Sequence, residues 1–299
     1  MKVKIICRKA LTLFKLLSYL LVFPLYKKYG TPRIMTIEET IKYVINNKMS
    51  VTRFGDGEYL HLKGVSTGLQ KNDTELQKKL IEAIKNKHSN LLVCLIDYLN
   101  QTNKTFLTKL SDAQFYVRTC KHIKQYIDSD YQYGNANMTR FYIHAIDKSA
   151  CKDYFVLCTQ IWEGADVVIF EGDKTRFGIR NDLLDNAKSV RRVLCPSNNA
   201  FIYYEQIISK AKTFDKNCLL LFALGITATI AASDLTNAGY QVIDIGNLDI
   251  EYEWFLSGTT KKIAISGKQV SEVTGGSTVN EVLDETYLSQ IIDTIGIGG

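Results

Sequence analysis

Residues Cys218–Ile245 read CLLLFALGITATIAASDLTNAGYQVIDI, and this stretch decides the fold class. It holds an apolar run (Cys218–Ala223), a helical stretch (Thr227–Ala238) closed by Gly239, and a β-branched run (Gln241–Ile245). Short, continuous apolar runs are typical of strands that are covered on both faces, as in parallel sheets. The order strand, helix, strand therefore predicts a βαβ unit with parallel strands.

The same alternation extends toward the N-terminus. Further strands are expected at Ser50–Phe54, Leu91–Ile96, Asp166–Phe170 and Val193–Cys195. Helices are expected from a capping box at Thr36 to about Asn47, over Asp73–Lys87, and over Asn199–Lys212. The pattern predicts an α/β protein with a Rossmann-like, doubly wound, mostly parallel sheet and helices on both faces.

The chain offers no clean division into several domains. It has only three prolines, no low-complexity linker and no internal repeat. We expect one domain over residues 31–270, which a body of this size supports. It follows a basic, apolar leader (residues 1–30) and precedes a tail (residues 271–299) with a helix at about Val279–Ile295 and a frayed end.

The net charge is concentrated in the leader. The 299 residues include 37 Lys and Arg against 31 Asp and Glu, a formal charge of +6. Residues 1–30 hold seven of the basic residues and no acid, which leaves 30 basic and 31 acidic groups in the body, a net charge of −1. A balanced body excludes a broad nucleic-acid interface, since that needs a basic face on the domain itself.

The leader has the composition of a membrane-surface anchor. Its apolar run, Leu16–Tyr26, is flanked by lysines and is about half the ~20 residues that a spanning helix needs. No small-residue cleavage site follows it, which disfavours a signal peptide. We expect residues 1–28 to bind the anionic, cytoplasmic side of the cell membrane. The alternative is a helix that packs on the body or on a partner subunit, since a homo-oligomer is compatible with the sequence.

The cysteines indicate a reducing environment. Seven are present, which is an odd number, no CxxC pair occurs, and several lie inside apolar runs. Buried free thiols explain this pattern better than disulfides or a zinc site.

Ligands of open α/β sheets bind at the carboxyl ends of the strands, where this chain carries polar clusters. Arg53-Phe54-Gly55-Asp56-Gly57-Glu58 places two carboxylates two residues apart on a glycine-flanked turn. Carboxylate oxygens are hard ligands suited to Mg²⁺ or Mn²⁺. A second cluster, Glu171 to Gly178, offers Lys174 and Arg176 as cations for a diphosphate, although a solvated loop explains it equally well.

Two further clusters follow the strands of the βαβ unit. Gly225 and Thr227 lie between strand and helix, where backbone N–H groups can approach an anion. The segment from Asp244 to Trp254 is acidic, and alternation would put Asp249, Glu251 and Glu253 on one face if it were extended. Three neighbouring carboxylates favour a metal, a nucleotide-sugar or a catalytic base.

Three long motifs together resemble the GT-D-type bacterial glycosyltransferases, a family first catalogued as a domain of unknown function. The motifs are RFGDGE at Arg53–Glu58, EGxxTRxGIxNDLLxNAKSVxRxxCPxxNAF at Glu171–Phe201, and LxALGxTATxxAxDLxxxGYQxIDIGxxDIEYEWF at Leu221–Phe255. The resemblance covers about Thr36 to Lys268.

The resemblance implies a metal-dependent transfer of a sugar from a nucleotide-diphosphate donor, with UDP as the expected nucleotide, to a glycan or lipid-linked acceptor. It places the family's metal- and diphosphate-binding Asp-x-Glu motif on Asp56 and Glu58. The chain departs from the family pattern at Ile226, where Pro is usual, at Asn247, where His is usual, and at Arg180, where Gly is more frequent.

The expected site combines these clusters. The metal, Mn²⁺ or Mg²⁺, is expected on Asp56 and Glu58. Donor-binding residues are expected to be Arg53, Gly55, Arg140, Lys174, Arg176, Asn181, Asp182, Gly225, Thr227 and Asn247. An inverting reaction would need a carboxylate base, for which Asp249, Glu251 and Glu253 are the candidates.

Two alternatives remain. A catalytically weak or silent relative could serve as a scaffold in a polysaccharide assembly complex, as the change at Asn247 suggests. Another nucleotide-binding α/β enzyme, such as an oxidoreductase, is disfavoured because neither GxGxxG nor a Walker pattern is present.

Overall fold

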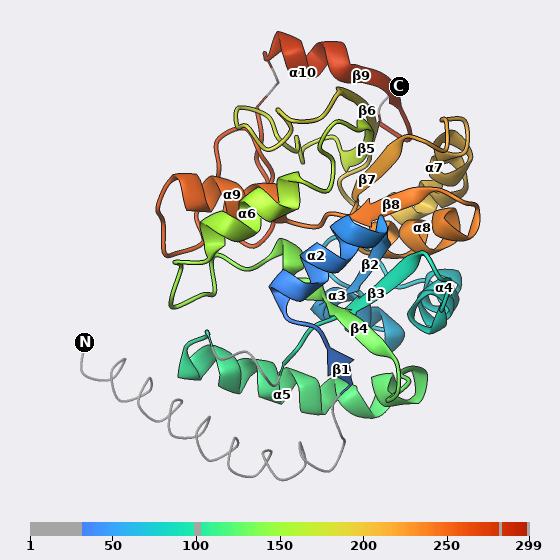
Figure 1. Ribbon diagram of the computed structural model, residues 1–299, viewed down its shortest axis with the longest axis vertical. Helices are drawn as coiled ribbons and strands as arrows, with labels where there is room; N and C mark the ends of the chain where they lie inside the picture. The colour runs from blue at the N-terminus through green and yellow to red at the C-terminus, as the bar shows by residue number, and fades with distance from the viewer. Residues whose placement is uncertain (1–31, 99–102, 281–282, 298–299) are drawn as a thin grey trace.

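The computed structural model describes residues 32–98, 103–280 and 283–297, so the leader lies outside the described residues. Within these ranges one sheet has the strand order β1-β4-β3-β2-β8-β7-β5-β6-β9 (Figure 1), and every strand pair in it is parallel. The strands are β1 (Arg33–Ile34), β2 (Ser50–Phe54), β3 (Leu91–Leu95), β4 (Gln132–Asn135), β5 (Asp166–Gly172), β6 (Ser189–Cys195), β7 (Leu219–Ala223), β8 (Gln241–Asp244) and β9 (Ile291–Thr294).

Helices cover both faces of this sheet (Figure 1). One face packs against α2 (Ile37–Asn47), α6 (Cys151–Thr159) and α9 (Leu248–Leu256). The other packs against α3 (Asp56–Leu62), α4 (Thr74–Lys85), α7 (Tyr204–Ala211) and α8 (Ile226–Asn237). The remaining helices are α5 (Phe106–Ile123) and α10 (Glu285–Gln290), with short 3-10 turns η1 (Lys124–Tyr126), η2 (Ala136–Thr139) and η3 (Ala200–Tyr203). The predicted doubly wound α/β fold is confirmed.

The apolar runs form strands because both of their sides are buried. In β7 Leu220 and Phe222 belong to one core cluster, and Leu219 and Leu221 belong to the cluster on the opposite face. Phe222 stacks on Phe170 of β5 with 4.6 Å between ring centroids. A strand that is covered on both faces has no polar alternation, which is why its sequence reads as a continuous apolar run.

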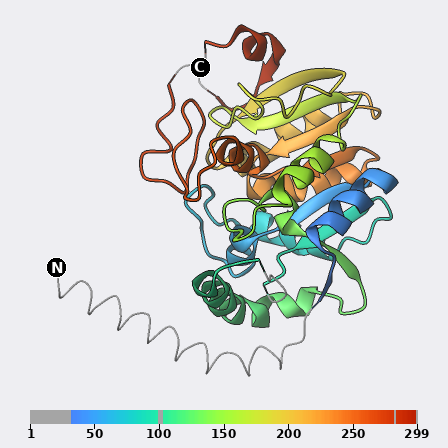
Figure 2. The same ribbon diagram turned by 60° about the vertical axis from the view of Figure 1, so that its left-hand side comes forward.

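Strands β2 and β8 are neighbours, and the chain leaves them toward opposite faces. After β2 it enters α3 and α4, and after β8 it enters α9 on the other face. Figure 2 shows the strand arrows pointing to one edge, with the segment after α9 lying outside it. This reversal is the topological switch point at which open α/β sheets bind ligands.

Three local predictions are wrong. The segment after β8 is the helix α9 rather than an extended run, so Asp249, Glu251 and Glu253 do not all share one face. The Asp56–Glu58 motif is the first turn of α3 rather than a free turn. The expected helix at Val279–Ile295 is replaced by the shorter α10 and by β9, whose β-branched residues pair with β6 at the sheet edge.

Other local predictions are confirmed. The capping box of α2 is present, with the Thr36 N–H donating to Glu39 at 2.8 Å and the Glu39 N–H donating to the Thr36 hydroxyl at 3.1 Å. The six cysteines in the described ranges are free and buried, and Cys7 lies in the leader. Searched over those same ranges, the molecule has no helix with the length and apolarity needed to cross a bilayer.

Gly134 in β4 tests how tightly neighbouring strands of the sheet pack together. A Cβ at this position would lie 2.4 Å from Cys94 Sγ and 2.8 Å from Leu92 Cδ2, both in the neighbouring strand. We expect Gly134→Ala to lower the free energy of unfolding by about 2 kcal/mol, measured by urea denaturation, because an overpacked core must distort. Gly68→Ala is the matched control: its Cβ would meet no atom within 4 Å, so its stability should change little.

Candidate active site

Open α/β sheets bind ligands outside the carboxyl ends of the strands at the switch point. We call this region at β2 and β8 the crevice, and Arg53 lies at its base. This side chain donates to the Asp244 carboxylate at 2.8 Å and to the Asp244 carbonyl at 2.8 Å. It also reaches the Ala136 carbonyl at 3.3 Å, so it joins β2, β8 and the turn after β4. Asp244 is almost fully buried, and the pair therefore forms the floor of the site.

Gly246 follows this pair because no side chain fits there. A Cβ on Gly246 would lie 2.0 Å from a terminal nitrogen of Arg53, and the backbone has φ of +51°. The glycine lets the turn after β8 lie directly over the guanidinium.

Glu58 lies at the third position of α3, close to the same floor. Its carboxylate accepts from the Gly55 N–H at 2.7 Å, and the Thr229 hydroxyl lies 3.4 Å from its other oxygen. Burial, followed by the nearby Asp244 carboxylate, raises the pKa of Glu58 to about 7. The side chain is thus held in place by α3 and α8 and is half protonated near neutral pH.

Asp56 occupies the first position of α3 and is more open to solvent. The Tyr98 hydroxyl donates to its carboxylate. Loss of hydration, followed by the negative charge of Asp112, raises its pKa, while Lys104 and Arg140 act in the opposite direction. Asp56 is therefore the carboxylate of the motif that faces the crevice with cations near it.

The N-terminus of α8 lies beside this motif. Gly225 precedes the helix with φ of +55°, and a Cβ there would meet no atom within 4 Å. The Thr227 hydroxyl in the first turn is fully buried and has no partner among the described residues. Ile226 approaches within 3.6 Å of a Cβ built on Gly57, which places this helix end next to the Asp56–Glu58 turn. The helix end offers backbone N–H groups, and Gly225 offers open space, to an anion.

Arg140 and Asn247 meet on the far side of the crevice, at Glu272. Arg140 ends η2, and its guanidinium lies 2.5 Å from a Glu272 carboxylate oxygen. The Asn247 amide donates to Glu272 at 3.3 Å, and Lys262 is paired with the same carboxylate. The structure thus brings Arg140 and Asn247 together through a residue that the sequence did not single out.

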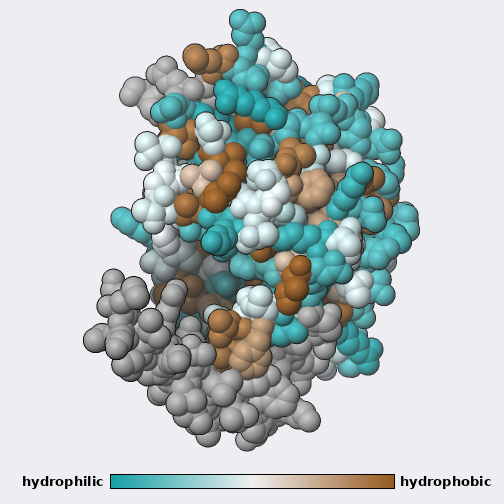
Figure 3. Space-filling model, turned by 90° about the vertical axis from the view of Figure 1, so that its left-hand side faces the viewer, coloured by the Kyte–Doolittle hydropathy of each residue, from teal (hydrophilic) through white to brown (hydrophobic). Residues whose placement is uncertain are grey.

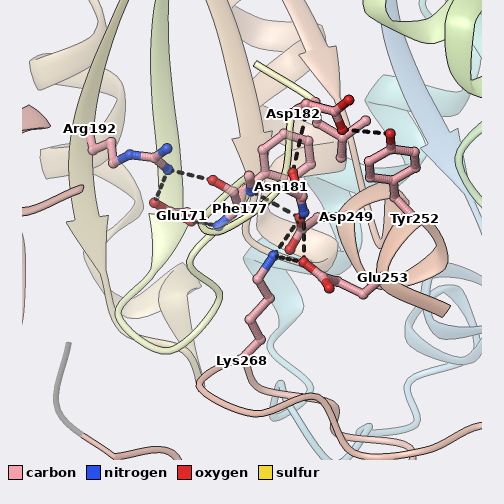
Figure 4. A network of polar contacts seen from close by, with 11 residues as sticks. Glu171, Phe177, Asn181, Asp182, Arg192, Asp249, Tyr252, Glu253 and Lys268 are labelled. Atoms are coloured by element: carbon pink, nitrogen blue, oxygen red, sulfur yellow. Dashed lines mark hydrogen bonds and ion pairs between the residues drawn. The ribbon is translucent and has the colours of Figure 1, made fainter. Parts of the chain in front are cut away.

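Two of the acidic candidates on α9 pair with a buried lysine instead of facing the crevice (Figure 4). Lys268 donates to Asp249 at 2.8 Å and to Glu253 at 2.7 Å, and Asn181 donates to the same two carboxylates. One turn of helix separates Asp249 from Glu253, so they share a side. These contacts tie both carboxylates to the fold, although the second oxygen of Asp249 is buried without a hydrogen-bond partner among the described residues.

Glu251 lies on a different side of α9, in the core. Its carboxylate accepts from the N–H groups of Tyr142 and Ile143 at 2.8 and 2.9 Å, and its second oxygen lies 3.8 Å from Arg140 Nε. It therefore fixes the loop that carries Arg140.

The loop after β5 serves mainly as a support. Arg176 donates to the carbonyls of Gly267 and Asn280 at 2.8 and 2.6 Å, so it holds the segment after α9. The backbone N–H of Lys174 donates to Ser197 at 3.1 Å. Asp182 accepts from the Tyr252 hydroxyl at 2.6 Å. Arg180 adopts φ of +60°, a backbone conformation that glycine adopts more readily than other residues.

The structure therefore gathers Arg53, Gly55, Asp56, Glu58, Gly225 and Thr227 at the crevice, with Arg140 and Asn247 at its rim. Sequence reasoning missed Tyr98, Thr229, Lys262, Lys268 and Glu272. Asp244 could have been identified from the sequence, because it is an acid at the end of an apolar strand. The others lie in helices or loops far from their partners in sequence.

The family model "Glycosyltransferase GT-D fold" matches residues 51–273. The chain belongs to the GT-D glycosyltransferase family.

Relatives of this GT-D chain agree with that assignment. It is 35% identical over 271 residues to glycosyltransferase GlyD of Streptococcus pneumoniae serotype 4 and 33% identical over 267 residues to the probable glycosyl transferase Gly of Streptococcus gordonii. The alignments cover 88% and 87% of this chain but 32% and 38% of those proteins, so the chain spans about a third of their length.

Two solved structures share the fold. A structure of domain of unknown function 1792, described as having a distinct glycosyltransferase fold, superposes with a TM-score of 0.88 and 35% identity, covering 92% of this chain and all of that one. A glycosyltransferase of the same domain family from Streptococcus sanguinis superposes with a TM-score of 0.84 and 31% identity, covering 89% of this chain and all of that one.

The raised pKa of Glu58 predicts an unusual pH dependence of stability. Between about pH 4.5 and 7 the folded protein retains a proton that the unfolded chain has lost, so stability falls as pH rises through this window. Glu58→Gln keeps an acceptor for the Gly55 N–H and removes this effect. In EDTA at pH 8 we expect the variant to be more stable than the parent by about 2 kcal/mol in urea denaturation.

Glu39→Gln is the matched control, because Glu39 holds the same capping-box position in α2. The N–H and hydroxyl of Thr36 lower the pKa of Glu39, so its loss should not stabilise the protein at pH 8. Equal effects of the two variants would contradict the assignment to Glu58.

Proposed function

We propose that this GT-D chain transfers a sugar from a nucleotide-diphosphate donor, a UDP-sugar, to a glycan acceptor in the synthesis of cell-surface polysaccharide or glycoprotein, with the help of Mn²⁺ or Mg²⁺. The observation that carries the proposal is the meeting of the Asp56 turn with the N-terminus of α8 at the switch point of the sheet. A carboxylate and an anion-binding helix end lie side by side there, as a diphosphate with a bound cation requires.

The carboxylates fit a cation that is shared with substrate phosphates. Searched over the part of the chain that the structure describes, no three His, Cys, Asp or Glu side chains form an all-protein metal cage. Mg²⁺ typically takes one or two carboxylates and completes its shell with water and phosphate oxygens. Asp56, which is open to solvent, would be the direct ligand. Glu58 is tied to Gly55 and Thr229 and would support it from behind.

Different groups of the protein would then act on different parts of the donor diphosphate. The N-terminus of α8, with Gly225 and the buried Thr227 hydroxyl, would receive the diphosphate oxygens. A cation on Asp56 would neutralise the charge that develops on the departing diphosphate. Arg140 would add a second positive charge from the rim. The new bond joins the acceptor oxygen to the anomeric carbon as the bond from that carbon to the diphosphate breaks, and the proton of the acceptor hydroxyl leaves with the diphosphate or through a base.

A carboxylate base for the acceptor proton is less well defined. Asp249 and Glu253 share one ion-pair partner, Lys268, and Glu251 accepts two backbone N–H groups. These contacts favour structural roles for all three and select no base among them.

A second candidate function rests on Asn247. An amide at this position, where the resemblance implies histidine, would be a poor metal ligand, and here it donates to Glu272. A silent relative that acts as a scaffold would fold in the same way but would bind no donor.

Substitution of Asp56 tests the site. We expect Asp56→Asn to lower Mn²⁺-dependent hydrolysis of UDP-sugars by about 100-fold or more, because the leaving diphosphate loses its neutralising cation. The measurement is a screen of several nucleotide sugars with and without Mn²⁺, with thermal shift as the binding readout.

Asp153→Asn on the exposed side of α6 is the control and should keep full hydrolysis. Full activity of Asp56→Asn would show that the metal site is elsewhere. A parent protein that is stabilised by no nucleotide sugar would favour the scaffold.

We further propose that residues 1–28 hold the enzyme on the anionic cytoplasmic face of the membrane, where lipid-linked acceptors reside. Figure 3 shows separate apolar groups among polar side chains on one face of the body, without a continuous apolar surface there. Deletion of residues 1–28 should therefore move the protein from the membrane to the soluble fraction after centrifugation. A full-length chain that is already soluble would refute the anchor and leave the catalytic proposal intact.

A further inference from the structure

Glu272 is surrounded by donors that come from three separate parts of the chain. The Arg140 guanidinium from the end of η2 lies at 2.5 Å, the Asn247 amide from the turn after β8 lies at 3.3 Å, and Lys262 from the loop after α9 pairs with it. Although burial opposes ionisation, Arg140 and Lys262 keep the pKa of Glu272 below its ordinary value. The carboxylate is therefore an ionised anion that these donors share.

This cluster adjoins the floor of the crevice. The Ala136 carbonyl accepts from Arg53 and opens η2, which ends at Arg140, and Gly246, which lies against the Arg53 guanidinium, precedes Asn247. His144 lies close to the same cations: burial, followed by Arg140, Lys262 and Lys104, lowers its pKa to about 4. Two of the donors of Glu272 therefore come from segments that border Arg53.

Glu272 contacts Arg140, Asn247 and Lys262 through its side chain. It lies in the turn Val270–Gly276, which is closed by the Val270 N–H to the Gly276 carbonyl at 2.8 Å and by the Val273 N–H to the Val270 carbonyl at 3.2 Å. Val270 is buried and anchors the turn. The Glu272 side chain can leave Arg140 and Lys262 by rotation, with the turn intact.

We propose that Arg140 and Lys262 form a subsite for the diphosphate group of a substrate, and that Glu272 occupies this subsite until the diphosphate displaces it. A guanidinium binds phosphate oxygens through paired, charge-assisted hydrogen bonds, and a lysine adds a mobile point charge. The side chains of Glu272, Arg140 and Lys262 are 27%, 26% and 32% exposed, so these ion pairs are open to solvent and a diphosphate can reach them. The identification of the diphosphate with the sugar donor rests on the proposed function.

The test measures binding of three probes to the full chain with Mn²⁺ present: inorganic pyrophosphate, UDP and geranyl diphosphate. Glu272→Gln removes the competing charge and keeps the size of the side chain. We expect it to lower the Kd for pyrophosphate about fivefold, which corresponds to the contribution of a partly exposed ion pair to binding. Arg140→Ala and Lys262→Ala should each weaken it by a similar factor. If the glutamine variant folds poorly, Glu272→Ala should strengthen pyrophosphate binding in the same way.

Glu38→Gln is the matched control. Glu38 pairs with Lys42 at 2.6 Å on the exposed side of α2, and its loss should leave all three affinities unchanged. If Glu272→Gln folds normally but binds pyrophosphate no better or more weakly than the parent, Glu272 is a structural ion-pair partner and the proposal is overturned.

The other two probes identify the source of the diphosphate. Tighter UDP binding by Glu272→Gln assigns the subsite to the sugar donor. Tighter binding of geranyl diphosphate, with UDP unchanged, keeps the subsite but assigns it to a prenyl-diphosphate acceptor. Failure of UDP to bind any variant would count against the proposed donor, whereas the pyrophosphate result would still decide the role of Glu272.

Discussion

The side chain of Arg53 joins the two strands at which the chain turns toward opposite faces of the sheet. Its bonds to Asp244 bridge β2 and β8, and its contact with Ala136 adds the turn after β4. Loss of one partner would leave a buried charge unpaired, which costs about 3–5 kcal/mol. The neighbouring residues help to keep this pair intact. Gly246 has no side chain that would overlap the guanidinium, and the Thr229 hydroxyl lies beside Asp244 and Glu58. The crevice above therefore has a floor whose charges are already satisfied.

Pairing also distinguishes the charged groups that support the fold from those that can bind a ligand. Asp249 and Glu253 are matched by Lys268, and Glu171 is matched by Arg192 and by the Phe177 N–H. These buried groups hold the loops after β5 and β8 at fixed positions. Asp56, by contrast, is exposed and accepts from one tyrosine, and the Thr227 hydroxyl is buried without a partner among the described residues. Chemistry is expected where the pairing is incomplete, because only such groups gain by binding a ligand.

The sequence predicted the fold well because burial on both faces of a strand leaves a direct mark in the chain. The runs in β2, β3, β5, β7 and β8 were found for this reason, and β4 (Gln132–Asn135) was missed because its residues are polar or lack a side chain. An extended conformation was considered for the acidic segment after β8 because Asp249, Glu251 and Glu253 alternate with other residues. The same sequence also fits a helix, which is what the structure shows. Partners such as Lys268 and Glu272 could not be predicted, because their roles depend on a loop that returns to the crevice from 15 or more residues away.

The balanced charge of the body agrees with the way in which cations near the crevice are paired with acids. A site for a nucleotide diphosphate must attract a strongly anionic ligand, yet a surplus of fixed cations would also attract nucleic acid and other anions. Here the cations of the rim are paired with acids of the same chain, Arg140 and Lys262 with Glu272 and Lys104 with Asp112. Under the proposed displacement, a ligand would gain the full attraction only by replacing such an acid, or by bringing a metal ion to Asp56. Selectivity for a diphosphate over a generic anion would then come from an exchange of partners, which a sum of charges over the sequence cannot reveal.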